Sequence, residues 1–226
     1  MYSIEKNLNR LSHHQSSFFL DPKQFMEIKG KLKKGEYSVY YPYHDSEKVI
    51  VYQKETPEVL LYEIKSKIEI RHQDILGTMY SLSIAPELFG DILLINGHYY
   101  IYILPIVQNY FESNFLMVRN STVELEEIPL STLEDYERSY EEIELLVSSN
   151  RMDTVISTIC HCKRSEIDGK IQKREILLNY DYLKDSSYKL KENDTFSIKR
   201  IGKFKYIGVV KTTKSDHLII NLLQYK

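Results

Sequence analysis

The sequence has few cysteines and no long apolar run. Cys160 and Cys162 are its two cysteines, and they lie too close together to form a disulfide framework. We therefore expect reduced thiols, as in proteins of the cytoplasm. The first ten residues contain no apolar signal-peptide core, and no window reaches the roughly 18 apolar residues that a membrane span needs. The sequence predicts a cytoplasmic protein that does not enter a membrane.

The sequence also lacks the motifs of the common enzyme families. It contains no G-x-x-x-x-G-K-[ST] loop, no G-x-S-x-G elbow and no H-E-x-x-H pair. Cys160-His161-Cys162 is a poor zinc site, because three consecutive residues cannot easily point at one ion and no second cysteine pair exists. We interpret Asp74 and Asp91 as capping or turn residues. These observations predict no catalysis, no cofactor, no metal and no small-molecule substrate.

Charge is distributed unevenly along the 226 residues. Residues 1–149 contain 14 Lys and Arg against 23 Asp and Glu, whereas residues 150–226 contain 16 against 9. A basic end on an acidic body indicates a module that binds a polyanion, although a solvated basic surface would give the same count.

The order of apolar runs and turn signals predicts an α+β fold in three parts. The parts are an N-terminal α/β segment, a central RRM-like (ferredoxin-like βαββαβ) domain and a C-terminal domain, over residues 1–57, 58–148 and 149–226. In the first part, Asp21 can cap a helix whose first residue is Pro22. Strand-like sequence follows around Tyr40 and again from Val49 to Tyr52.

The central part has the clearest pattern. Helical spacing runs from Asp74 to Leu82, and Asn96-Gly97 joins two strands as a tight hairpin. A second helix begins at Pro105, and the run that ends at Val147 is expected to close the domain. Exposed aromatics at Tyr99, Tyr100 and Tyr102 could stack on bases. Because no RNP-like run is present and the segment is acidic, we interpret these tyrosines as core or protein-contact residues.

The third part resembles the S4 RNA-binding domain. That family's pattern runs R-x-D, S-R, a V-x-V-N-G-like strand and a G-D turn. The matching residues are Arg151-Met152-Asp153, Lys163-Arg164-Ser165, Ile176 to Tyr180, Asn193-Asp194 and Arg200 to Phe204. The sequence departs from the pattern with Lys163 in place of serine, Arg174 in place of glycine and Asn193 in place of glycine. Asn tolerates the left-handed backbone conformation well.

Short motifs in the other two parts resemble those of the YlmH family of bacterial S4-domain proteins, which are often encoded near cell-division genes. These motifs are Phe19 to Pro22, His72 to Gly77 and Gly90-Asp91-Ile92. The resemblance implies a C-terminal αL-type S4 domain that binds rRNA or tRNA without catalysis. It further implies association with the large ribosomal subunit and a role in ribosome-associated quality control.

Basic residues of the third part are the predicted RNA contacts. Lys163, Lys170 and Arg174 recur at intervals that would place them on one helical face. Arg164 and Arg174 rank first because guanidinium groups bind phosphate bidentately. Asp153 is interpreted as a structural partner of a nearby cation. The full predicted set is Arg151, Lys163, Arg164, Ser165, Lys170, Lys173, Arg174, Arg200, Lys203 and Lys205.

Two other functions fit the same sequence. A protein-interaction factor of the division machinery would use the acidic central part and its tyrosines. An RNA-modifying enzyme is the third possibility, because S4 domains occur attached to pseudouridine synthases and tyrosyl-tRNA synthetases. The synthase arrangement has its S4 module at the N-terminus, and the synthetase nucleotide motifs are missing here.

Overall fold

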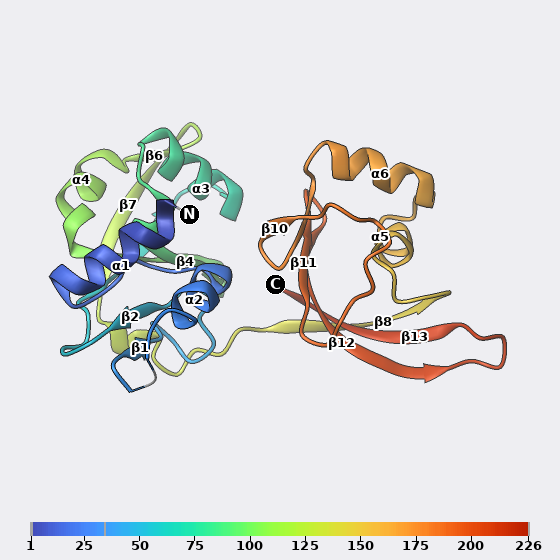
Figure 1. The fold of residues 1–226 in the computed structure, drawn as a ribbon. Coiled ribbons are helices and arrows are strands. Elements are labelled where there is room, and N and C mark those ends of the chain that lie inside the picture. The colour runs from blue at the N-terminus through green and yellow to red at the C-terminus, as the bar shows by residue number, and fades with distance from the viewer. Residues whose placement is uncertain (1, 34, 226) are drawn as a thin grey trace. The chain divides into compact units, whose positions relative to one another are not determined.

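The computed structural model describes residues 2–33 and 35–225 and contains both helices and sheets, which confirms the predicted α+β class (Figure 1). The chain forms two compact units, Met1–Glu137 and Arg138–Lys226. The division at residues 57 and 148 stays a prediction. Within the described ranges, no helix has the length and apolar content to cross a bilayer.

The N-terminal segment begins with helix α1, Tyr2–His14, which the sequence reasoning missed. Its apolar residues Ile4, Leu8 and Leu11 recur at helical spacing and pack near Leu20 and Ile28. Polar and histidine residues between them hid this pattern. Because the apolar face of α1 contains only these three residues, the helix depends on packing against Leu20 and Ile28 for its stability.

The predicted start of the next helix is confirmed. Helix α2 is Pro22–Lys29, and the Asp21 carboxylate accepts a hydrogen bond from the backbone N–H of Gln24 at 2.8 Å. The Gln24 side chain accepts one from the Asp21 N–H in return. This reciprocal pair is a capping box. The two following strands, β1 (Ser38–Tyr40) and β2 (Ile50–Tyr52), pair antiparallel with each other.

A five-stranded sheet in the order β4-β5-β3-β7-β6 forms the centre of the first unit. Its strands are β3 (Leu60–Ser66), β4 (Phe89–Ile95), β5 (His98–Ile103), β6 (Met117–Val118) and β7 (Ser121–Ile128). The helices between them are α3 (His72–Ser81) and α4 (Gln108–Asn114), with 3-10 turns at Pro86–Leu88, Pro105–Val107 and Leu130–Thr132. Asn96 and Gly97 have φ of 51° and 85°, so they form the predicted hairpin turn between β4 and β5.

Both faces of this sheet are covered. One face packs against α3 and α4 through residues such as Tyr62, Ile75 and Phe111. The opposite face packs against Phe18, Phe19 and other residues outside the sheet. Tyr99 is 7% exposed and Tyr102 is fully buried, which confirms the core interpretation for these two strand aromatics.

Gly90 of the Gly-Asp-Ile motif is required by close packing. A Cβ atom at this position would lie 3.0 Å from a ring carbon of Phe19 and 3.0 Å from the Cβ of Tyr102, both of which are buried. We expect Gly90→Ala to lower the free energy of unfolding of the first unit by about 1–3 kcal/mol, because neither neighbour can move freely. Denaturant titration measures this. Gly77→Ala, where a Cβ meets nothing within 4 Å, is the matched control and should not destabilise the unit.

A six-stranded antiparallel sheet in the order β10-β9-β11-β12-β13-β8 forms the second unit. Its strands are β8 (Tyr140–Val147), β9 (Ile176–Leu178), β10 (Asp181–Tyr182), β11 (Thr195–Ile198), β12 (Gly202–Thr212) and β13 (Leu218–Tyr225). Helices α5 (Met152–Cys160) and α6 (Arg164–Gln172) pack on one face, where Val155, Ile156 and Ile167 meet Phe196 and Phe204 in a buried core.

Strand β8 corrects one prediction. We expected the run that ends at Val147 to close the central domain, but it pairs along its whole length with β13, the last strand of the chain. Val147, Leu145 and Ile143 lie opposite Leu218, Ile220 and Leu222. The alternating pattern was recognised, whereas the choice of partner strand depends on a contact about 75 residues away in sequence. Strand β7 occupies the expected closing position instead.

Candidate RNA-binding surface

Asp153 brings two of the predicted arginines together. Its carboxylate lies in the first turn of α5 and is 10% exposed. Arg151, the residue before the helix, donates Nε and Nη2 to it at 3.2 and 2.9 Å. Arg164, the first residue of α6, donates Nη2 at 2.6 Å. The prediction that Asp153 pairs with a cation is confirmed, and it pairs with two.

The ionised state of Asp153 is strongly favoured. Burial of the carboxyl group opposes ionisation, but hydrogen bonds from Arg151 and Arg164 outweigh burial and hold the pKa of Asp153 well below its ordinary value. The carboxylate also accepts the backbone N–H of Thr154 at 2.7 Å. Asp185 is a second carboxylate that interacts with Arg151, so the charge of the two guanidinium groups is largely compensated at the start of α5, while the Arg164 side chain remains half exposed at the start of α6.

The start of α6 carries three of the predicted residues. Lys163 precedes the helix, and Arg164 and Ser165 are its first two residues, all exposed. The Glu166 carboxylate accepts a hydrogen bond from the Lys163 backbone N–H at 2.9 Å and so closes the helix end. The expectation that Lys163, Lys170 and Arg174 share one helical face is wrong, because only Lys170 lies within α6.

Lys170 and Lys173 differ in their surroundings. The Lys170 amine lies 3.7 Å from the Glu175 carboxylate, and its side chain is 29% exposed, so part of its charge is already compensated. Lys173 follows the last residue of α6 and is exposed. Of the two, Lys173 is better placed for a phosphate.

Arg174 follows the helix in the left-handed conformation, with φ of 55°. This backbone geometry explains why the S4 pattern has glycine here. Its guanidinium lies 5.4 Å from the ring centre of Tyr182, an exposed residue of β10. The N–H of Lys199 donates to the carbonyl of Glu175 at 2.8 Å, which brings the β11–β12 turn beside the end of α6. Arg200, in that turn, is therefore near Arg174 in the fold.

Lys203 and Lys205 are not brought together with the helix cations. They alternate on β12 with Phe204, which is buried under α5 and α6. Their side chains therefore lie on the opposite face of the sheet, away from the helices. The Lys203 amine donates to the Tyr180 hydroxyl at 3.1 Å and lies 4.7 Å from the ring centres of Tyr180 and Tyr225. This packing gives Lys203 a structural role.

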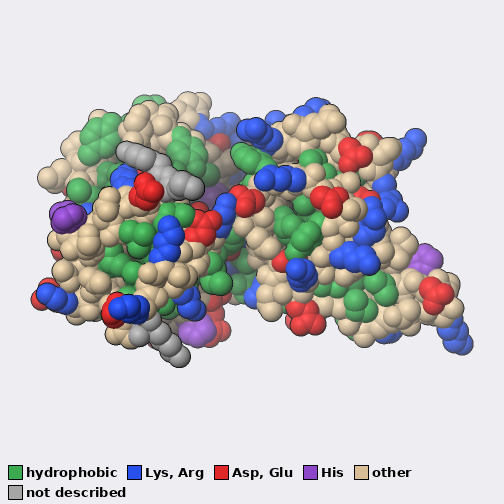
Figure 2. Space-filling view, in the orientation of Figure 1, with side chains coloured by type: hydrophobic (Ala, Val, Ile, Leu, Met, Phe, Trp, Pro, Cys, Tyr) green, Lys and Arg blue, Asp and Glu red, His purple; other side chains and the backbone are tan. Residues whose placement is uncertain are grey.

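Seven of the ten predicted residues thus fall into two groups near the ends of α5 and α6, and Lys170, Lys203 and Lys205 lie outside both groups. Group one is Arg151, Lys163, Arg164 and Ser165, and group two is Lys173, Arg174 and Arg200. Figure 2 shows basic side chains spread over the visible face of this unit, with acidic side chains between them. Sequence reasoning missed Lys199, which precedes Arg200, and Tyr182; the first could have been found from the run Lys199-Arg200 itself.

The described part of the chain contains no group of three His, Cys, Asp or Glu side chains that could hold a metal ion. Burial raises the pKa of the Cys160 thiol, so this cysteine is less nucleophilic than an exposed one.

The chain is similar to a family model, to a curated relative and to a solved structure. Residues 53–132 match the family model described as "Putative RNA-binding domain in YlmH". Ribosome-associated protein quality control protein P2 of Bacillus subtilis (strain 168) is 22% identical over 211 residues, covering 88% of this chain and 82% of that protein. The solved structure of cell division protein ylmH from Streptococcus pneumoniae is 25% identical with a TM-score of 0.46, covering 58% of this chain and 90% of that one.

Proposed function

With the resemblance to the YlmH proteins confirmed, we propose that this chain is a non-catalytic protein that binds structured rRNA or tRNA on the large ribosomal subunit. Its biological role in this proposal is ribosome-associated quality control, which is the role in the name of the B. subtilis relative. The single observation that carries the proposal is the arginine pair held by Asp153 beside the exposed lysines that flank α6, Lys163 and Lys173.

The second unit would be the S4 module. Two short helices on one face of a small sheet, with the R-x-D arginine and the α6 arginine meeting on one carboxylate, support this assignment. Groups one and two would contact phosphates through their basic side chains. Such a surface recognises duplex RNA by shape and backbone charge, so binding should weaken steeply with salt.

The central sheet would be an RRM-like domain. Its β-α-β-β-α-β order and the neighbours β4-β5-β3-β7 in antiparallel pairing support this assignment. Residues 53–132 nevertheless contain 5 Lys and Arg against 11 Asp and Glu. Because Tyr102 is buried and the net charge is negative, we assign the main phosphate contacts to the second unit and a positioning or protein-contact role to this one.

Sedimentation with ribosomes tests the proposal. In a sucrose gradient at low salt, about 0.05 M, the protein should migrate with large subunits and leave them as salt rises to about 0.2 M. A protein that stays at the top of the gradient and retains a protein partner would favour the division-factor alternative. Loss of one modified rRNA or tRNA nucleoside when the protein is absent would contradict the non-catalytic part of the proposal.

A further inference from the structure

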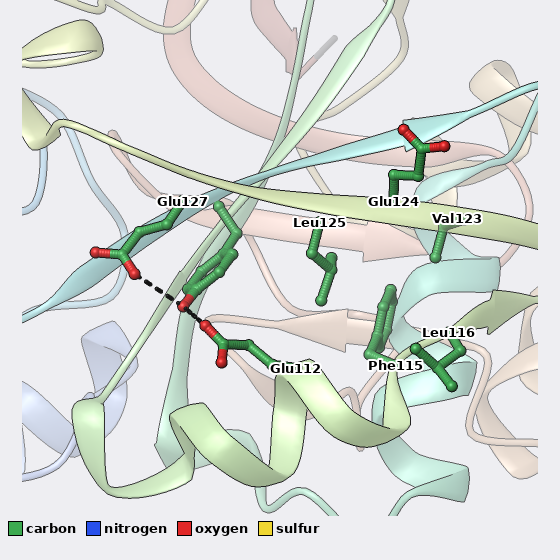
Figure 3. A pocket seen from close by; sticks show the side chains of 8 residues that line it. Glu112, Phe115, Leu116, Val123, Glu124, Leu125 and Glu127 are labelled. Atoms are coloured by element: carbon green, nitrogen blue, oxygen red, sulfur yellow. Dashed lines mark hydrogen bonds between the residues drawn. The ribbon is translucent and has the colours of Figure 1, made fainter.

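A groove in the first unit lies between helix α4 and strand β7 and opens to the surface as a pocket of about 410 Å³. We call it the α4–β7 groove. Its floor is apolar and includes the buried side chains of Phe115 and Val123 and the half-buried Leu125. In Figure 3, Phe115 and Leu125 point into the space between the helix and the strand. A side chain from a partner could therefore rest on an apolar surface here.

The rim of the groove is acidic. Tyr62 donates its hydroxyl to Glu112 at 2.5 Å, and the same oxygen lies 3.1 Å from Glu127 (Figure 3). The Gln108 amide lies within 3.2 Å of both carboxylates. Desolvation of the hydroxyl and its bond to Glu112 raise the pKa of Tyr62, so it remains a neutral donor. Two carboxylates are thus held side by side by neutral groups.

No ion pair balances this rim among residues 2–33 and 35–225. Glu112 and Glu127 form no ion pair there, whereas Glu126 is paired with Lys65, which also lies opposite Glu124 and attracts it. By strand alternation, Glu127 faces α4, and Glu124 and Glu126 face the other side of the sheet. Figure 3 shows Glu124 pointing away from the groove floor. The carboxylates that no described cation pairs with, Glu112 and Glu127, therefore lie on the side of β7 that faces α4.

The outer edge of β7 is also open. Strand β6 pairs only with Ser121 and Thr122, and the Val123 N–H donates to the Leu116 carbonyl at 3.0 Å. Backbone groups alternate in direction along a strand, so those of Leu125 and Glu127 point the same way as that of Val123, away from β3. Beyond Val123 no strand in the described ranges pairs with this edge. Such an edge can take up one further strand.

We propose that the α4–β7 groove binds an extended, Lys- or Arg-rich peptide segment of a partner protein, which adds as a strand to the edge of β7. The backbone of the peptide pairs with Leu125 and Glu127. Its basic side chains alternate along the peptide, share the face toward α4 and reach Glu112 and Glu127, and their aliphatic stems cover Phe115 and Leu125. Nucleic acid is disfavoured because the rim repels phosphate. This inference concerns the first unit and does not depend on the RNA-binding proposal.

The test uses the full chain and a fluorescein-labelled peptide of roughly ten residues in which Lys alternates with Val. We expect binding by fluorescence anisotropy and, by NMR, slowed hydrogen exchange at the amides of Leu125 and Glu127. Glu112→Gln/Glu127→Gln should weaken binding about tenfold or more, because it removes two charges while keeping groups that can bond to Tyr62. The matched control Glu36→Gln/Glu55→Gln makes the same charge change at exposed positions outside the groove and should leave affinity unchanged.

Peptide variants separate strand pairing from charge attraction without altering the protein. A peptide with Glu in place of Lys should not bind. Two further peptides are N-methylated at every second residue, the first at the odd positions and the second at the even positions. The peptide whose methyl groups point toward β7 should not bind, because it cannot donate hydrogen bonds to the strand edge. Equal binding by both N-methylated peptides, equal loss in the control variant, or protection of amides away from β7 would overturn the proposal. Protection of Leu125 and Glu127 by a single-stranded RNA instead of the peptide would also overturn it.

Discussion

Replacing Arg174 with glycine is expected to weaken binding of the protein to rRNA about tenfold at roughly 0.1 M salt, without destabilising the fold. Arg174 has φ of 55°, which costs a residue with a side chain roughly 1 kcal/mol that glycine does not incur. The substitution therefore removes a cation while relieving the backbone. A loss of affinity could not be explained by unfolding, which denaturant titration would verify.

Adding Arg164→Gln to this variant should weaken binding by about a further tenfold. The slope of affinity against salt should fall by about one for each phosphate group that the variant no longer binds. Binding is measured by filter retention over a salt series. The control is Lys211→Gln/Lys214→Gln, which removes two exposed charges near the β12–β13 turn. If the control and the double variant lose affinity equally, net charge alone governs binding, and the assignment of the RNA-binding surface to the residues around α6 is wrong.

Replacing Asp153 with asparagine should weaken RNA binding even though it makes the protein more positive. The carboxylate holds Arg151 and Arg164 in one place, and an amide can accept from only one of them well. We expect about a tenfold loss of affinity from the freed arginines and a loss of about 2 kcal/mol in the free energy of unfolding. Solvent screens this interaction in part, because the two arginine side chains are 36% and 51% exposed.

The pH dependence of this effect has a definite sign. The pKa of Asp153 is depressed in the folded protein. The ionised carboxylate therefore contributes its full stabilisation at pH values above 3.8, which is the pKa of the group in the unfolded chain. That contribution is lost as pH falls through the folded pKa. The stability difference between the original protein and Asp153→Asn should be constant near neutral pH and shrink below about pH 4. Urea titrations of both proteins at several pH values measure this.

Two results would contradict the role assigned to Asp153. If Asp153→Asn bound RNA more tightly, charge would outweigh arginine positioning at this site. If the stability difference did not change with pH, the carboxylate would not be the group that stabilises the α5 and α6 ends. Asp168→Asn, an exposed acidic residue of α6, is the matched control for the change in charge and should show neither effect.

Much of the secondary structure followed from local signals. The Asp21-Pro22 helix start, the Asn96-Gly97 hairpin and the strands of the second unit depend on capping, turn geometry and alternation within a few residues. Helix α1 was missed because its three apolar residues are separated by polar ones. Its apolar side is defined by tertiary packing, because Leu20 and Ile28 cover it.

The candidate surface was predicted only in part. Arg151, Arg164 and Asp153 were selected by their motif spacing, and the carboxylate does join the two arginines. The prediction that Lys163, Lys170 and Arg174 share one helical face was wrong because α6 ends before Arg174. Lys203 and Lys205 were grouped with the helix cations on sequence proximity, but burial of Phe204 turns both to the far face of the sheet.

The sequence by itself determined most of the elements after α1, the charge difference between the two ends of the chain and the R-x-D motif, because each depends on residues close together in the sequence. Only the tertiary structure decided that β8 joins the last strand and that Tyr62, Glu112 and Glu127 meet beside an open strand edge. These contacts join residues about 15 to 80 positions apart. Which partner a strand or side chain meets depends on how whole elements pack, and local periodicity does not encode that choice.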